Sequence, residues 1–478
     1  MKKKNFIIIT LIGTFLLFSI LPISNYMVDI TRVLHHDYNY KYDKLNANRI
    51  FLRVLYLLDN KKKYDTLVFG SSRGEFIDTN KISAKAYNMF HGFGTLSTYL
   101  QSLKTLLAND VQVKNVWIAI NDFEIWKDHS NTLHKLTYKN GLMQNLPLYT
   151  RWLFRKSSEN IEVIQNSLPL VKNDFITDPT TQRIIRAYNQ ERKLPKKRDI
   201  PAAMLGYTGQ YKIDASIRDM KEIKELCHKY NIKLTVFMYP SYYKTYLRYD
   251  QEKIDEFKIK LSSIVDFHDF YTLDKTSIDT SKWFDGSHFV PSIGDYIINN
   301  IKKGNFLITK ENINTHIKQT RLRLKDMSNL PSDSIYLCQT NLDLSSYKKI
   351  FDIYDDKFTY IKNNDFSLKK NRHYFDIIVN NSDPMFILNN YKTNAKNIAL
   401  DFSIDSNQKG VFQLYIKHTK DLSYHEKNTH VVKLKKGLNV FRIIIPSKFL
   451  HNGLRVDFTQ NTGEYKLNKF LIRELISS

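Results

Sequence analysis

Residues 64–74 read YDTLVFGSSRG, and this stretch decides the fold of the first half of the chain. Its apolar part, Tyr64–Phe69, has the length of a buried strand, and Gly70 follows at once. A short apolar run that ends in glycine and serine favours a strand, a tight turn and then a helix. We therefore expect Ser71 and Ser72 on that turn, at the exposed edge of a sheet.

The segments that follow repeat the alternation of strand and helix. Short apolar runs predict strands and amphipathic runs predict helices. Strands are expected at 86–90, 113–120, 233–239 and 261–268, and helices at 95–107, 213–230 and 291–301. This alternation predicts an α/β fold with a parallel, doubly wound sheet covered on both faces. In such sheets the functional site lies at the carboxyl ends of the strands.

The chain of 478 residues is too long for one ordinary domain, and its character changes along its length. We expect residues 1–28 to form a cytoplasmic tip and a membrane anchor. Residues 29–305 are expected to form the α/β domain, with an insertion at about 127–200, and residues 306–333 a helical connector. After that, short alternating strands separated by turns predict an all-β sandwich over 334–478. Its clearest strands are expected at 398–404, 411–416, 430–434, 439–445 and 454–458.

The N-terminal segment decides the compartment. Three lysines at 2–4 precede Phe6–Ile23, which carries no charge and can cross a hydrocarbon core of about 30 Å. The lysines place the N-terminus in the cytoplasm and the globular part outside it, in the periplasm or extracellular space, on a single-pass cell-membrane protein. A cleaved signal peptide is the alternative, but residues 24–38 offer no convincing small-residue cleavage site.

Charge and cysteine content narrow the classes of partner. Lys and Arg outnumber Asp and Glu by 72 − 48 = 24, which fits either an anionic partner or a solvated lysine surface. A location outside the cytoplasm argues against nucleic acid. Cys227 and Cys338 have no metal-ligand spacing, so neither a zinc site nor a disulfide framework is expected. A metal at His268 with Asp266 and Asp269 lacks a further ligand, and we predict no metal and no cofactor.

Two motifs carry residues for nucleophilic catalysis. Ser72 lies on the first turn, and Asp285-Gly-Ser-His288 precedes the last helix of the α/β part. A serine hydroxyl needs a histidine to take its proton and a carboxylate to orient that histidine. Each motif alone has an ordinary structural explanation, because serine and aspartate are both favoured helix caps. Together they predict a triad of Ser72, His288 and Asp285.

The order of these motifs resembles the SGNH, or GDSL-type, hydrolase superfamily over about residues 65–301. Gly70-Ser71-Ser72 matches the first block, with Ser71 in place of the usual aspartate, and Asp285 and His288 match the last. Gly92 or Gly94 stands where a glycine amide completes the oxyanion hole, together with the amide of Ser72. Asn121 matches the oxyanion asparagine, although Ala119 replaces the glycine of that block. The resemblance implies a three-layer SGNH-like domain.

Within the superfamily, the departures in the blocks and the N-terminal anchor look like alginate O-acetyltransferases and teichoic-acid D-alanylation proteins. This resemblance implies serine-dependent O-acyl transfer, with acetyl expected, to a cell-envelope or secreted polysaccharide. A membrane-bound O-acyltransferase partner would supply the acyl group. Arg73 and His91 are further candidates for substrate contact. The C-terminal sandwich looks similar to carbohydrate-binding modules of the jelly-roll type. Two alternatives stay open, a polysaccharide acetyl-esterase of the same fold and a non-catalytic glycan-binding assembly protein.

Overall fold

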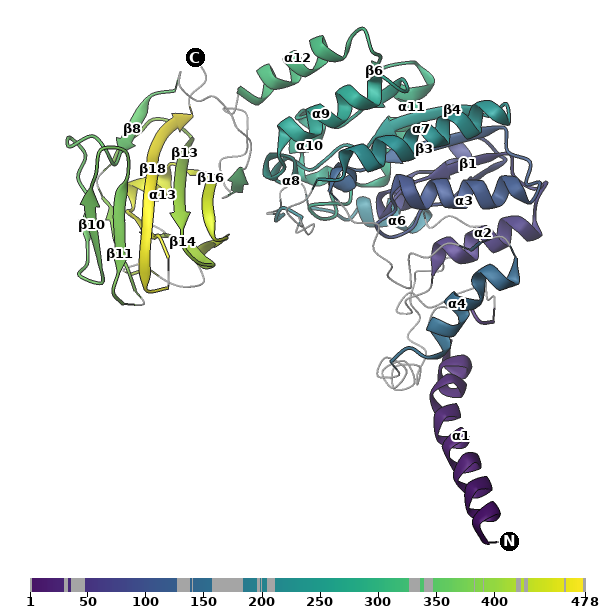
Figure 1. The fold of residues 1–478 in the computed structure, drawn as a ribbon. Coiled ribbons are helices and arrows are strands. Elements are labelled where there is room, and N and C mark those ends of the chain that lie inside the picture. The colour runs from purple at the N-terminus through teal and green to yellow at the C-terminus, as the bar shows by residue number, and fades with distance from the viewer. Residues whose placement is uncertain are drawn as a thin grey trace.

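The computed structural model describes most of the chain, drawn in Figure 1. The described residues are 2–29, 33–35, 48–126, 138–139, 141–156, 184–195, 198, 200–203, 211–325, 336–338, 347–381, 383–389, 391–417, 423–424, 429–459 and 461–475. Most of the predicted insertion at 127–200 and the predicted boundary between 333 and 334 lie outside these residues. The division into domains therefore stays a prediction.

A six-stranded sheet with the order β2-β1-β3-β4-β5-β6 forms the centre of the first part. Its strands are β1 (Thr66–Phe69), β2 (Ala86–Asn88), β3 (Asn115–Ile120), β4 (Lys233–Met238), β5 (Phe267–Asp269) and β6 (Leu307–Ile308). The first five strands are parallel, and β6 runs antiparallel to β5. The expected parallel sheet is confirmed, and the carboxyl ends of β1, β3 and β4 meet at one edge.

Helices accompany this sheet as the alternating pattern predicts (Figure 1). Helices α2, α3, α7 and α9 pack against one another in that order, and α6 and α11 pack together near the turn that follows β1. The bounds are α2 (Arg49–Asp59), α3 (Leu96–Ala108), α6 (Ile184–Glu191), α7 (Ile213–Lys229), α8 (Tyr243–Arg248), α9 (Gln251–Ser262), α10 (Lys275–Ile278) and α11 (Pro291–Lys302). Strand β1 is buried along its whole length, as a central strand of a covered sheet should be.

One prediction at the end of this part needs correction. The strand expected at 261–268 begins only at Phe267, because residues 261–262 complete α9. The expected helical connector contains a helix, as its sequence predicts, and it also adds a strand to the sheet. Its Leu307–Ile308 pairs with β5, and α12 (Ile313–Lys325) packs against α9 with Ile313 in the hydrophobic core. Charged residues surround these few apolar positions and obscure them in the sequence.

The second part is antiparallel and all-β apart from a short helix, α13 (Lys448–His451). One sheet has the order β10-β11-β18-β13-β16-β7, with β8 also paired to β18, and the other has the order β15-β14-β17-β12-β9. The strands are β7 (Tyr336–Cys338), β8 (Lys349–Asp352), β9 (Ile361–Lys362), β10 (Phe366–Lys370), β11 (Phe375–Val379), β12 (Phe386–Leu388), β13 (Asn397–Ser406), β14 (Gly410–Ile416), β15 (Thr429–Leu434), β16 (Gly437–Pro446), β17 (Leu454–Asp457) and β18 (Gly463–Leu475). The five strands predicted most clearly are found within two residues of their expected ends.

Packed aromatic rings fill the core of this second part. Phe402 stacks on Phe441 and Phe470, and Phe412 packs edge-on against Phe441. Such contacts add about 0.5–1.5 kcal/mol each beyond the burial of their area. The expected all-β architecture is therefore confirmed, with its own hydrophobic core.

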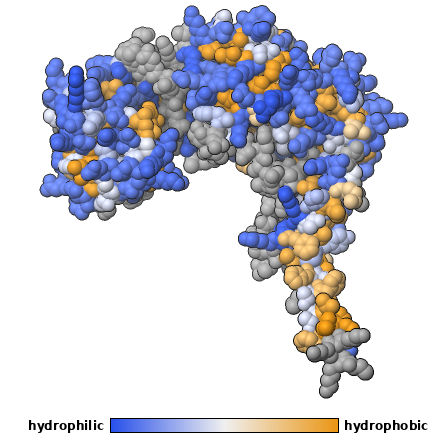
Figure 2. Space-filling view, viewed as in Figure 1, coloured by the Kyte–Doolittle hydropathy of each residue, from blue (hydrophilic) through white to orange (hydrophobic). Residues whose placement is uncertain are grey.

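The N-terminal helix α1 (Lys2–Val28) projects from the α/β part (Figure 1). Its segment Asn5–Val28 is long and apolar enough to cross a membrane, and its hydrophobic window is not buried against the rest of the chain. Figure 2 shows hydrophobic residues along this projecting helix. By length and composition an N-terminal signal sequence would pass the same test.

A buried ion pair joins the last strands to the helices. Lys258 Nζ lies 2.5 Å from Asp269 Oδ2, and His316 Nε2 lies 2.7 Å from the same oxygen. Lys258 also donates to the carbonyl of Tyr271 at 3.0 Å. Asp269, which the sequence offered as a weak metal candidate, therefore has a structural role.

We predict that Lys258→Met destabilises the α/β part by about 3–5 kcal/mol, because it leaves the buried Asp269 carboxylate without its main counter-charge. All four tryptophans lie in the α/β part, so urea unfolding followed by tryptophan fluorescence measures the effect. Lys253→Met, which breaks an exposed pair with Glu256, is the control and should leave the midpoint unchanged. Equal midpoints for the two variants would contradict the assignment.

The same pair predicts a direction for acid unfolding. Burial opposes the charged form of Asp269, but Lys258 and His316 hold the pKa of this carboxyl below its usual value. Its contribution to stability is therefore present above the unfolded pKa of about 4, and it is lost as the pH falls through the lower folded pKa.

Candidate active site

The first turn differs in one respect from the sequence prediction. After β1 and Gly70 the chain forms a single 3-10 turn, Ser72–Phe76, and not an α-helix. The hydroxyl of Ser71 caps this turn by accepting the Arg73 amide at 3.4 Å. Gly74 lies inside the turn, where glycine is a poor helix former, and the backbone is extended again at Ile77. Ser72 thus lies on a short, tightly closed turn.

Both glycines of this turn are required by close packing. A Cβ atom on Gly70 would lie 2.4 Å from the hydroxyl of Tyr239, and one on Gly74 would lie 2.7 Å from Cβ of Phe90. Tyr239 follows β4 and is buried. The spacing Gly-Ser-Ser-Arg-Gly is therefore explained by the neighbours that the turn must accommodate.

The structure brings the three predicted triad residues together. His288 Nε2 lies 2.8 Å from Ser72 Oγ, and His288 Nδ1 lies 2.8 Å from Asp285 Oδ2. The other carboxylate oxygen of Asp285 accepts the amides of Ser287 at 2.7 Å and His288 at 2.8 Å. A carboxylate, an imidazole and a serine hydroxyl in this order form the arrangement that general-base activation of serine requires.

Asp285 is held in its charged form. Burial disfavours the carboxylate, but hydrogen bonds and charge from His288, with the two backbone amides, lower the pKa of Asp285 below its usual value. A carboxylate that stays ionised can orient the imidazole and stabilise its protonated form. The side chains of Asp285 and His288 remain 57% and 30% exposed, so solvent and ligands can reach this side of the site.

Side chains from three other segments hold the backbone around Asp285 and His288. Thr245 Oγ1 on α8 donates to the carbonyl of Gly286 at 2.6 Å, and Arg73 Nε donates to the carbonyl of Ser287 at 2.8 Å. Arg198 donates to the carbonyls of Trp283 and Phe284. Sequence reasoning missed Thr245 and Arg198, because nothing in their local sequence indicates contact with a turn so far along the chain.

The predicted oxyanion residues also lie beside the first turn. Ser71 Oγ donates to Asn121 Oδ1 at 2.6 Å, which leaves the Asn121 amide nitrogen as the donor; its contact to the Gly94 carbonyl is long, at 3.4 Å. The Gly94 amide already donates to the carbonyl of His91 at 3.1 Å. Within the described part of the chain, the amides of Ser72 and Gly92 make no hydrogen bond, and a Cβ on Gly92 would meet open space. Gly92 therefore has the available amide.

Gly94 has a packing role instead. A Cβ atom there would lie 2.8 Å from the carbonyl of Gly70 and 2.7 Å from the hydroxyl of Tyr99. Only a glycine lets this segment approach the end of β1 so closely. The sequence could not separate Gly92 from Gly94, because the difference depends on which amide is engaged in the folded chain.

The two predicted substrate contacts are buried. Arg73 is 1% exposed, and its Nη2 pairs with both carboxylate oxygens of Asp122 at 3.0 and 3.1 Å. His91 is 2% exposed and its Nε2 lies 3.0 Å from Thr98 Oγ1. Neither side chain is presented to a ligand at the surface, so a role in substrate binding finds no support in this geometry.

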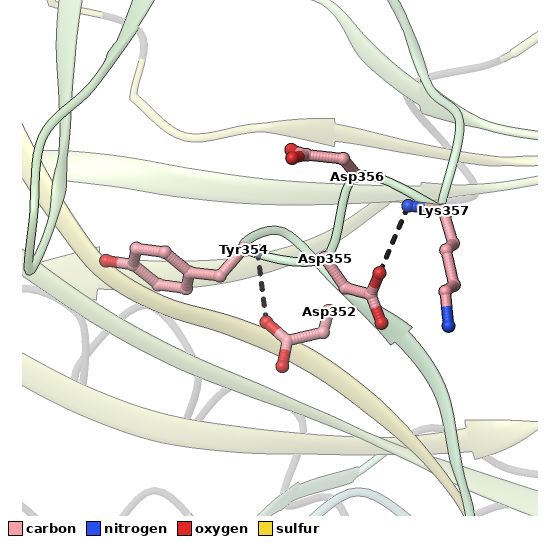
Figure 3. A pocket seen from close by; sticks show the side chains of 5 residues that line it. All are labelled: Asp352, Tyr354, Asp355, Asp356 and Lys357. Atoms are coloured by element: carbon pink, nitrogen blue, oxygen red, sulfur yellow. Dashed lines mark hydrogen bonds between the residues drawn. The ribbon is translucent and has the colours of Figure 1, made fainter.

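Other parts of the described structure offer weaker candidates for a ligand site than the segment around Ser72. Among the described residues, no group of three or more His, Cys, Asp or Glu side chains could hold a metal ion. In the β part, a cavity of about 640 Å³ is lined by Asp352, Tyr354, Asp355, Asp356 and Lys357 (Figure 3). Its carboxylates partly cap the local turn, since Asp352 accepts the Tyr354 amide and Asp355 accepts the Lys357 amide.

Comparisons with known proteins identify no family. No protein-family model and no curated protein matches the chain. Among solved structures it is similar to BiXyn10A CBM1 in its apo form, at 10% identity over 27% of this chain and 99% of that chain, with a TM-score of 0.21. It is also similar to CBM29_1, a family 29 carbohydrate binding module from Piromyces equi, at 8% identity over 30% and 91%, with a TM-score of 0.21. These scores describe a weak likeness to carbohydrate-binding modules, which carries no argument about this chain.

We predict that Thr245→Val slows the reaction of Ser72 with a fluorophosphonate probe about tenfold, because it removes the hydrogen bond to the carbonyl of Gly286 and the one that Thr245 accepts from the Ala203 amide. The loss of a buried hydrogen bond costs about 1–3 kcal/mol, and here it loosens the turn that carries His288. Thr245→Ser restores the hydroxyl and should restore the rate. The labelling rate is measured by mass spectrometry of the Ser72 peptide, beside the unfolding midpoint. If Thr245→Ser reacts as slowly as Thr245→Val, the hydrogen bond to Gly286 does not position the turn.

Proposed function

We propose that this chain is an extracytoplasmic, serine-dependent O-acyltransferase of the SGNH type, which transfers an acyl group, with acetyl expected, to a cell-envelope or secreted polysaccharide. The observation that carries the proposal is the hydrogen-bonded chain from Ser72 Oγ through His288 to Asp285. The parallel sheet, the order of the sequence blocks and the position of Ser72 after β1 support the assignment to a three-layer SGNH-like domain.

The proposed reaction is a double displacement. His288 Nε2 takes the proton of Ser72 as its oxygen attacks the carbonyl carbon of the acyl donor, and the leaving group departs with that proton. An ester between Ser72 and the acyl group remains. A sugar hydroxyl then gives its proton to His288 and attacks this ester, which forms the acylated sugar and returns the proton to Ser72.

Three donors are available for the oxyanion of each tetrahedral intermediate. The amides of Ser72 and Gly92 make no hydrogen bond within the described part of the chain, and the side-chain nitrogen of Asn121 has a long contact to the Gly94 carbonyl and a contact to the Tyr99 hydroxyl. Donors that are fixed before the reaction stabilise developing charge most effectively. Ser71 fixes Asn121, so the residue that departs from the family pattern supports the same function.

The remaining parts fit this proposal. Helix α1 would hold the chain in the cell membrane with its N-terminus in the cytoplasm, and the β part, of jelly-roll type, would bind the polysaccharide acceptor. The acyl donor would come from a membrane-bound O-acyltransferase partner, because acyl carriers of the cytoplasm are absent outside it. Nothing in this chemistry needs a cofactor or a metal, since the triad and its oxyanion donors supply each step.

An acetyl-esterase of the same fold is the second candidate. The exposure of Asp285 and His288 favours it, because water reaches an open site and could replace the sugar hydroxyl in the second step. The two activities share the triad and differ only in the acceptor. A non-catalytic glycan-binding assembly protein is the third candidate, and it requires that Ser72 does not react with an acyl donor.

We expect Ser72→Ala to lower turnover of p-nitrophenyl acetate by the full chain about 10³-fold or more, because no other group replaces the nucleophile. The assay contains an acceptor oligosaccharide, and mass spectrometry follows acetate release and acetylated sugar separately. Ser263→Ala, at the exposed end of α9, is the matched control and should retain wild-type turnover.

The products separate the three candidates. Ser72-dependent acetylation of the sugar supports the transferase, and Ser72-dependent acetate release without transfer supports the esterase. Equal rates for wild type and Ser72→Ala, together with no labelling of Ser72 by a fluorophosphonate, would leave the glycan-binding protein as the surviving candidate.

A further inference from the structure

Asp29, the residue just after α1, binds the segment that follows the helix. It has a φ of 36° and is 1% exposed. Its oxygens accept the amides of Val33 at 3.3 Å and His35 at 2.9 Å. A carboxylate buried in this way fixes the direction in which the chain leaves α1.

Helix α1 is also joined directly to α4 (Leu142–Leu153). Asn25 is 1% exposed, and its side-chain nitrogen donates to the carbonyls of Leu153 at 2.7 Å and Arg155 at 2.9 Å. Carbonyls at the end of a helix have no partner within it, so Asn25 satisfies the end of α4. The two helices are therefore held together where α1 ends.

A small hydrophobic core continues this junction into the α/β part. Val33 packs with Phe51 and Leu55 of α2 and with Leu148 and Trp152 of α4. Phe51 and Trp152 meet edge to face at 5.1 Å between ring centroids. Val33 follows α1 and shares this core with α2 and α4, and Asn25 joins α1 itself to α4, so the apolar helix is held against the α/β part through α4.

The face of α4 that points away from the buried Leu148 and Trp152 is apolar and exposed. Met143 is 77% exposed, Leu146 is 50% exposed and, just beyond the helix, Phe154 is 55% exposed. Spacings of three and eight residues place them along one side. At the end of α1, Tyr26 and Met27 are exposed as well. Figure 2 shows hydrophobic residues on α1 and again directly above it, at the level of α4.

The length of α1 places this face relative to a bilayer. The 20 residues from Phe6 to Asn25 rise about 30 Å at 1.5 Å each, which is the thickness of the hydrocarbon core. Asn25, and with it the end of α4, then lies at the outer boundary. The cationic residues Arg151, Arg155 and Lys156 follow at the same level, where they suit anionic headgroups.

We propose that the outer face of α4, with Tyr26 and Phe154, lies in the headgroup region of an anionic phospholipid leaflet and holds the α/β part at a fixed height above the membrane. We call this surface the membrane collar. The inference rests on the proposed role of α1 as an uncleaved membrane helix. Aromatic rings at this depth and cations beside them are the side chains that membrane interfaces favour.

The test uses the full chain, with Cys227→Ser and Cys338→Ser, reconstituted into vesicles of phosphatidylglycerol and phosphatidylcholine. A nitroxide label is attached to Leu146→Cys, Phe154→Cys or the control Ile259→Cys, which is exposed on α9. Relaxation by oxygen, which concentrates in lipid, is compared with relaxation by a water-soluble nickel chelate. We expect the logarithm of this ratio to be higher at 146 and 154 than at 259, and to fall when phosphatidylglycerol is omitted.

Each other outcome overturns the collar. Ratios at 146 and 154 equal to that at 259 would place α4 in water, although the chain still sediments with vesicles. Protection from both reagents would show that protein covers this face. A chain that has lost α1 and stays in the supernatant would overturn the membrane anchor as well. This outcome distinguishes failure of the proposed membrane attachment from failure of the collar alone.

Discussion

The buried ion pair between Arg73 and Asp122 sets the geometry of the candidate site. Arg73 follows Ser72 directly, and Asp122 lies just after β3, so the pair joins the ends of two neighbouring strands. Ser241, after β4, donates to the same carboxylate at 3.0 Å. Arg73 then reaches Ser287, next to His288, through its Nε. One guanidinium therefore links the turn of Ser72 to the turn of His288.

The energetic consequence follows from burial. Both charges of this pair are almost completely removed from water, so neither can be deleted without leaving an uncompensated charge. Such a pair adds little net stability compared with apolar residues of the same size, so its contribution here is to hold together the groups that it joins. That property suits a site whose serine and histidine are 216 positions apart in the chain and must meet within hydrogen-bond distance.

Ser71 shows how a departure from a family pattern can be compatible with its geometry. Its hydroxyl accepts the Arg73 amide and donates to the oxygen of the Asn121 side chain. An aspartate in its place would put a carboxylate oxygen next to the amide oxygen of Asn121, and neither oxygen can donate a hydrogen bond. Asn121 would then have to flip its side-chain amide. Serine at position 71 is therefore compatible with the observed orientation of Asn121, in which the amide oxygen accepts from Ser71 and the amide nitrogen remains the donor.

Sequence reasoning succeeded where local pattern determines structure. The strand before Gly70, the helix from Pro291 and the motif Asp285-Gly-Ser-His288 are all visible in short windows, because burial and caps act over a few residues. Strand β18 was not predicted as an element, since Asn468, which the register with β13 skips, and Lys469 interrupt the alternation that its buried Tyr465, Leu467 and Phe470 provide. Thr245 and Arg198 were missed because their hydrogen bonds to backbone carbonyls depend on which distant segments the fold places beside them. The burial of Arg73 was not predicted for the same reason, because no local signal separates an arginine in an ion pair from one that binds a ligand.

The openness of the triad bears on what selects the acceptor. Asp285 and His288 keep much of their surface, so the site itself does not exclude water. A transferase with an open triad must favour transfer by holding a sugar hydroxyl in place more often than water attacks, because proximity can replace a high concentration of acceptor. The groups that hold the sugar then have to lie outside the triad. Selection of the acceptor would thus depend on surfaces that surround the site, while Ser72, His288 and Asp285 would supply the chemistry common to the proposed transfer and to hydrolysis.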